Sequence, residues 1–90
     1  MNFSEALVAI RERKKLRRAG WLRPQIYVVF QAGYPDGIAI NKNTAEATGQ
    51  PEGTMMKFAP YLMLVDTEGM NAPWTPYIID LLAEDWEVVG

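Results

Sequence analysis

The stretch QIYVVFQA, residues 25–32, constrains the fold of this chain more than any other. β-Branched and aromatic residues fill it, and turn-forming residues stand on both sides, which is typical of a β-strand. We therefore predict a strand from Gln25 to Ala32. The short apolar runs around it, separated by turn signals, predict further antiparallel strands.

Turn residues and a proline mark the limits of four further expected strands. The segment YPDG, residues 34–37, predicts a turn, because Pro35 presets its own dihedral angle, Asp36 accepts local backbone bonds and Gly37 takes the strained conformation. Pro60 indicates an edge strand or a bulge near the start of the expected strand at residues 58–66. The four expected strands are Lys15–Arg18, IAIN (38–41), FAPYLMLVD (58–66) and WEVV (86–89).

An amphipathic helix is predicted over Ser4–Arg13. Apolar residues recur there at helical spacing, Ser4 can cap the first turn, and Glu5 lies near the positive end of the helix. The basic run that follows suits the negative end.

Two shorter helical segments are expected. In NTAEATG, residues 43–49, Asn43 is the predicted cap, Glu46 its reciprocal partner and Gly49 the exit residue. Before the final strand, an amphipathic stretch is expected to turn three side chains inward: Ile78, Leu81 and Leu82.

These elements predict an α+β fold in a single domain spanning residues 1–90. A small antiparallel β-sheet is packed by the N-terminal helix, with a short C-terminal helix and a final strand. A chain of this length buries only about two thirds of its unfolded surface, so its core is expected to be small. Self-association would cover further apolar area and add stability.

The chain has no cysteine and no histidine, which removes disulfides, thiolate chemistry, the commonest general base and the commonest zinc ligand. Asp80 and Glu84, four residues apart, would share a helix face and could act as an acid–base pair, but no nucleophile stands near them. We expect no catalytic residues, no metal site and no cofactor, and hence a protein that is not an enzyme.

The net charge of −2 argues against general nucleic-acid binding. Basic residues crowd the first quarter of the chain and acidic residues the end, so the two ends can pair with each other or with a second copy. No apolar run reaches the roughly 18 residues of a membrane span, and the start MNFSEALVAI lacks the pattern of a secretion signal. We expect a cytoplasmic protein without membrane contact.

Trp21 and Trp74 stand at strand ends beside glycine or proline, where side chains tend to lie at the rim of a sheet. Trp86, inside the last strand, is the better core residue. Two rim tryptophans with Arg17 or Arg18 nearby would combine a stacking platform with a phosphate clamp. The alternative is that both tryptophans serve only as packing anchors.

Three blocks of the sequence resemble the Thoeris anti-defence two family of phage and prophage proteins: MNFSEALVAIRERKKLRRAGW, ATGQPEGT and PWTPYIIDLLAEDWEVV. The most specific parts are RRAGW and DLLAEDWEVV. Members of that family are sponges that sequester a cyclic ADP-ribose immune signal without degrading it, and some hold cyclic oligonucleotides. The resemblance implies an α+β subunit, a homotetramer with ligand pockets between subunits, and a location in the cytosol of the bacterial host.

The resemblance also implies which residues bind the ligand. Trp21 and Trp74 would form walls for the adenine or ribose, Arg18 would neutralise a phosphate, and Asp80 would accept ribose hydroxyls or orient the arginine. Asn71 and Thr75 are weaker polar candidates. The sequence leaves two other readings open: a structural or protein-interaction module that only builds an oligomer, and a hydrolase using Asp80 and Glu84.

Overall fold

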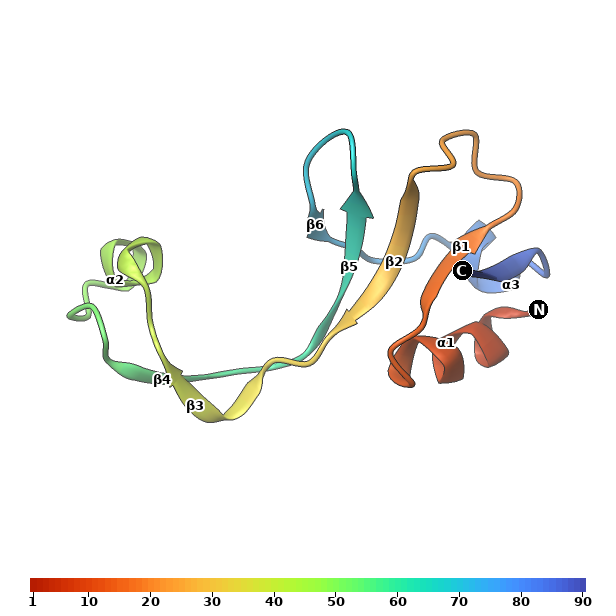
Figure 1. Cartoon of the computed structure of the whole chain (residues 1–90). Coiled ribbons are helices and arrows are strands. Elements are labelled where there is room, and N and C mark those ends of the chain that lie inside the picture. The colour runs from red at the N-terminus through yellow and green to blue at the C-terminus, as the bar shows by residue number, and fades with distance from the viewer.

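The computed structural model describes residues 1–90 and is α+β, which confirms the expected fold class. The helices are α1 (Phe3–Arg11), α2 (Lys42–Thr48) and α3 (Ile78–Leu82), and the strands are β1 (Lys15–Arg18), β2 (Ile26–Gln31), β3 (Tyr34–Ala39), β4 (Met55–Phe58), β5 (Tyr61–Asp66), β6 (Ala72–Pro73) and β7 (Trp86–Val89). Five strands form an antiparallel sheet in the order β6-β5-β2-β1-β7, and β3 pairs with β4 in a second ribbon. Figure 1 shows a body built on the larger sheet and an arm, residues 34–58, with α2 at its tip.

Helix α1 begins one residue earlier than the sequence predicts. Its cap is Asn2 and not Ser4, because the Asn2 side chain accepts the Glu5 N–H at 2.9 Å while the Glu5 carboxylate accepts the Asn2 N–H at 3.0 Å. This reciprocal pair is a capping box. The helix ends at Arg11, and Arg13 lies outside it with a left-handed φ of 71°.

The core lies where α1 crosses β1, β2 and β7. Its largest fully buried side chains are those of Trp86, Ile10, Leu16 and Val28, so the expected core role of Trp86 is confirmed. Leu16 of β1 pairs with Val28 of β2 on one side and Val88 of β7 on the other. Only nine of the 90 residues are buried, so the core is small, as expected from the length.

Strands β2 and β5 run on into the arm through a sharp break. Gln31 pairs with Tyr61 in the body, and the next pair is Tyr34 with Phe58 in the arm. Gly33 lies at this break with φ of 70°, and a Cβ there would stand 2.6 Å from the Phe58 carbonyl oxygen. The single strand predicted over residues 58–66 is divided: β4 ends at Phe58 and β5 begins at Tyr61, with Pro60, which has no backbone N–H to donate, between them.

The predicted turn at residues 34–37 is wrong. These residues belong to β3, whose pairing with β4 shifts register between Tyr34 and Ile38. Gly37 does adopt a positive φ, 102°, but as part of this irregularity and not of a chain reversal. Neighbouring backbone from β4 supplies partners that a local turn pattern does not reveal.

The chain reversal of the arm occurs at α2. Its cap is Asn41, whose side chain accepts the Thr44 N–H at 3.0 Å, so the predicted cap at Asn43 and its Glu46 partner are wrong by two residues. Gly49 ends the helix with a left-handed φ of 77°, as predicted. The protein is elongated, with a radius of gyration of 15.6 Å against roughly 12 Å for a compact chain of this length.

Helix α3 reverses the expected burial. Ile78, Leu81 and Leu82 are 65%, 42% and 75% exposed, whereas Asp80 is buried. The helix has only five residues and ends before Glu84, so Asp80 and Glu84 do not share a helix face. No helix in the structure has the length and apolarity that crossing a membrane requires.

Candidate functional site

Arg18 joins two carboxylates at the end of β1. Its Nε donates to Asp85 Oδ1 at 2.8 Å, and its Nη1 donates to Asp80 Oδ1 at 3.1 Å. Arg18 and Asp80, both expected at the ligand site, are therefore in direct contact. One cation faces two anions, so the cluster of Arg18, Asp80 and Asp85 carries a net charge of −1 when all three are ionised.

Asp80 is the fixed member of this cluster. Its side chain is 6% exposed, and its second oxygen, Oδ2, accepts the Tyr77 N–H at 2.9 Å, which caps α3. Its carbonyl oxygen accepts the indole N–H of Trp86 at 2.9 Å. A buried carboxylate with a guanidinium and an amide donor is well satisfied, so Asp80 is held by its helix, the arginine and the core.

Asp85 is the more exposed member, with 34% of its side chain accessible. Besides Arg18, its carboxylate accepts the Gly20 N–H at 3.0 Å through Oδ2. The hydrogen bond from Arg18 lowers the pKa of Asp85, against an opposing effect of desolvation, and the Gly20 N–H lowers it further. In turn the hydrogen bonds to Asp85 and then Asp80 raise the pKa of Arg18, so the guanidinium stays charged.

Sequence reasoning missed Asp85 and Gly20 as parts of this site. The signal is the antiparallel pairing of RR with EDW: Arg18 lies opposite Trp86, and the Ala19 N–H donates to the Asp85 carbonyl at 2.9 Å. That pairing places the residue before Trp86 beside the residues after Arg18. The register of two strands far apart in sequence must be known before this proximity can be inferred.

The three tryptophans form one cluster beside the arginine. Ring centroids are 5.5 Å apart for Trp21 and Trp86, 6.0 Å for Trp74 and Trp86, and 6.2 Å for Trp21 and Trp74, all in edge-to-face geometry. Trp21 and Trp74 are half-buried against the core, while Trp86 is fully inside it. The backbone N–H of Trp21 donates to the Arg18 carbonyl at 3.0 Å, which fixes the turn that places Trp21 just after β1.

Asn71 and Thr75 are not joined to this cluster by any hydrogen bond. The Asn71 side chain accepts the Asp66 N–H at 3.0 Å and thereby closes the loop between β5 and β6. Thr75 follows Trp74 and is exposed. Of the six residues predicted to bind ligand, the structure thus groups Arg18, Asp80, Trp21 and Trp74.

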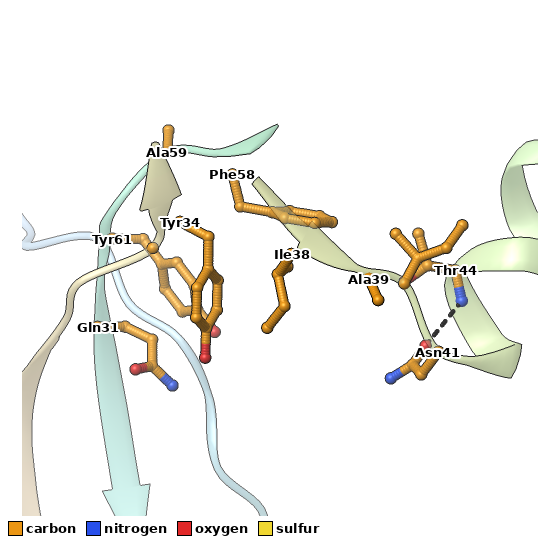
Figure 2. Close-up of a pocket in the computed structure, with 11 residues that line it drawn as sticks. Gln31, Tyr34, Ile38, Ala39, Asn41, Thr44, Phe58, Ala59 and Tyr61 are labelled. Carbon is orange, nitrogen blue, oxygen red and sulfur yellow. Dashed lines mark hydrogen bonds between the residues drawn. The ribbon is translucent and has the colours of Figure 1, made fainter. Parts of the chain in front are cut away.

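The larger of the two cavities lies elsewhere, at the base of the arm, and has a volume of about 540 Å³. Figure 2 shows Tyr34 and Tyr61 with their rings pointing the same way, next to Gln31, and with Ile38 and Phe58 farther along the arm. None of the six predicted residues lines it. The cavity forms at the break between body and arm, which the sequence did not reveal.

The site is an aromatic and charged surface at one end of the main sheet of a small α+β protein. It combines half-buried indoles, one guanidinium and two carboxylates. Nowhere do three or more carboxylates converge in a way that would hold a metal ion. The chain belongs to the Thoeris anti-defense 2-like domain family, whose model matches residues 1–89. This confirms the resemblance seen in the sequence and assigns the chain to an anti-defence family. No curated protein matches the chain in sequence.

Proposed function

We propose that this protein binds a cyclic ADP-ribose-type nucleotide and holds it without degrading it, so that the signal is withdrawn from a Thoeris defence system. The family match over residues 1–89 carries this proposal. The grouping of Trp21, Trp74 and Arg18 supports it, since aromatic faces and a guanidinium are what a phosphorylated nucleotide requires.

Each group has a distinct task in this proposal. The partly exposed ring of Trp21 or Trp74 stacks against adenine, and Arg18 contacts the pyrophosphate. Asp80 keeps the guanidinium in place through its 3.1 Å hydrogen bond, which lowers the conformational entropy that ligand binding would otherwise cost. A chain without histidine or cysteine offers few groups for bond cleavage, which favours sequestration over turnover.

The proposed active form is a homotetramer in which neighbouring subunits complete the ligand pocket. The elongated shape and the low number of buried residues, nine of 90, support this, because a folded chain of this size gains stability by covering apolar surface. Exposed apolar side chains lie on the arm and around α3: Tyr34, Met55, Phe58, Tyr77, Ile78, Ile79 and Leu82. We assign both surfaces to contacts between copies of this chain.

Light scattering tests the assembly. Met55→Asp on the arm and Ile79→Asp on α3 should each lower the mass below that of four copies, because each places a charge in an apolar contact. Thr67→Asp, in the exposed loop between β5 and β6, is the matched control and should leave the mass unchanged. A wild-type protein that stays monomeric at high concentration would contradict the tetramer.

The alternative function is an oligomerisation module with no nucleotide ligand, which the same exposed apolar side chains favour. It predicts a stable oligomer whose melting temperature does not change with any nucleotide. Calorimetric titration with cyclic ADP-ribose-type nucleotides and cyclic dinucleotides separates the two functions.

Recovery of the ligand then separates binding from catalysis. After titration the protein is denatured and the nucleotide analysed by mass spectrometry. Intact nucleotide in stoichiometric amount supports sequestration, whereas a cleaved product formed at substoichiometric protein would replace the proposal with an enzymatic function.

A further inference from the structure

Between Arg18 and Gly20 there is a position built for an anion. Arg18 Nε and the Gly20 N–H both point at the Asp85 carboxylate, at 2.8 Å and 3.0 Å. A guanidinium together with a backbone amide is a common way to hold a phosphate oxygen. In the structure this position is filled by a side chain of the protein itself.

Gly20 has a steric role in this position. Its φ is not in the left-handed region, so its backbone does not require glycine. A Cβ on Gly20 would instead stand 3.0 Å from Asp85 Oδ2, closer than such contacts normally come. The missing side chain therefore makes room for Asp85 Oδ2.

The two aspartates on Arg18 differ in how firmly they are held. Asp80 is buried, caps α3 and accepts a hydrogen bond from the Arg18 guanidinium. Asp85 is one-third exposed, and its backbone is fixed independently by the Ala19 N–H. The Asp85 side chain can therefore rotate into solvent without breaking the strand pairing, whereas Asp80 cannot move without uncapping α3.

We propose that Asp85 is a displaceable internal anion. Its carboxylate occupies the anion position formed by Arg18 Nε and the Gly20 N–H, here called the anion seat, until the phosphate or pyrophosphate of a ligand replaces it. The inference rests on the proposed function and adds a specificity-determining residue to its site. A ligand must outcompete a carboxylate that is already in place, so a phosphate-bearing nucleotide binds and an uncharged nucleoside gains nothing from this position. When a ligand phosphate replaces the Asp85 carboxylate, Arg18 keeps Asp80 as its partner.

Opposite effects of the two aspartates test the inference. Asp85→Asn removes the competing charge while preserving side-chain shape, and should tighten binding of the cyclic ADP-ribose-type nucleotide by about tenfold. Asp80→Asn removes the fixed partner of the guanidinium and should weaken it. Glu87→Gln is the control, because it removes a carboxylate of equal charge from the neighbouring Arg17 without freeing Arg18, and should change affinity little. Adenosine affinity should not respond to Asp85→Asn.

A second measurement does not depend on the identity of the nucleotide. Inorganic pyrophosphate is titrated into the Asp85→Asn protein while the Gly20 amide resonance is followed by NMR. A saturable shift of this resonance, absent or far weaker in the wild type at the same concentrations, supports the seat. Asp85→Ser serves in the same way if the asparagine variant does not fold.

The outcomes keep this inference separate from the proposed function. If the wild type binds the nucleotide but Asp85→Asn leaves its affinity unchanged or lower, and Gly20 does not respond, the displaceable anion is wrong while sequestration stands. If no nucleotide binds the wild type, the proposed function fails, and a Gly20 shift with pyrophosphate still supports the seat. If pyrophosphate shifts the Gly20 resonance in neither the wild type nor the Asp85→Asn protein, the displaceable anion is wrong.

Discussion

The indole nitrogen of Trp86 donates a hydrogen bond to the carbonyl oxygen of Asp80 at 2.9 Å. This bond connects the largest side chain of the core to the helix that carries the buried partner of Arg18. Core packing and the geometry of the charged cluster are thus coupled through one pair of residues. A substitution in the core should therefore alter the position of Asp80 and its pairing with Arg18.

Trp86→Phe should show this coupling. Phenylalanine keeps most of the apolar volume but leaves the Asp80 carbonyl without its donor, so the free energy of unfolding should fall by about 1–3 kcal/mol in urea titrations. Val88→Ala, at a partly exposed position of the same strand, should cost less. A Trp86→Phe protein as stable as the wild type would show that the hydrogen bond contributes nothing.

The break between body and arm depends on Gly33. Alanine there must adopt a left-handed conformation, which costs about 1–2 kcal/mol, and its Cβ would also collide with backbone. Gly49→Ala is the matched control, since Gly49 has a similar φ of 77° but no atom within 4 Å of the added Cβ. Urea unfolding should therefore show a larger loss for Gly33→Ala, and equal losses would mean that the steric contact is relieved.

The ion pair between Arg18 and Asp85 predicts a pH dependence. Because Arg18 lowers the pKa of Asp85 in the folded protein, the native state binds fewer protons than the unfolded state just below the ordinary pKa of about 3.9. The stability that this pair supplies is complete above that value and is lost as the pH falls through the lowered pKa. Asp85→Asn should thus be less stable than the wild type at neutral pH.

Thermal unfolding between pH 7 and pH 2 checks this sign. The difference between the wild type and Asp85→Asn should shrink towards zero at the acid end of the range. Asp36→Asn, which removes an exposed carboxylate of the arm that forms no hydrogen bond, should show no such trend. A difference that grows with acidity would contradict the direction of the Asp85 pKa shift.

The stacking role of the tryptophans is open to a direct substitution. Trp21→Ala should reduce nucleotide affinity by about 1–3 kcal/mol if a base stacks on this ring. Since Trp21 also packs on Trp86, the melting temperature must be measured alongside the calorimetric titration. Leu22→Ala, beside it and almost fully exposed, is the control. Lower stability with unchanged affinity would assign Trp21 to packing alone.

Local sequence signals predicted the elements of the body well. The strand at QIYVVFQA, the first helix and the core position of Trp86 all follow from periodicity and turn residues. The predicted caps lie two residues from the observed ones. Asn2 competes with Ser4 at the first helix and Asn41 with Asn43 at the second, and the sequence alone does not say which amide each can reach.

Features that depend on distant pairing were not predictable in this way. YPDG has the composition of a turn, but β4 supplies backbone partners that keep it extended. Helix α3 was expected to bury its aliphatic face, yet Arg18 holds Asp80 inside and turns Ile78 and Leu82 outwards. Asp85 escaped notice for the same reason, since its partners lie 67 and 65 positions away in the chain.

A crystal structure of the protein with a cyclic ADP-ribose-type nucleotide tests the central claim most directly. We predict an intact ligand with a base against Trp21 or Trp74 and its pyrophosphate on Arg18 and Gly20, with the Asp85 side chain turned into solvent. A ligand seated only among Tyr34, Tyr61 and Gln31 at the base of the arm, with Arg18 still bound to both aspartates, would contradict it.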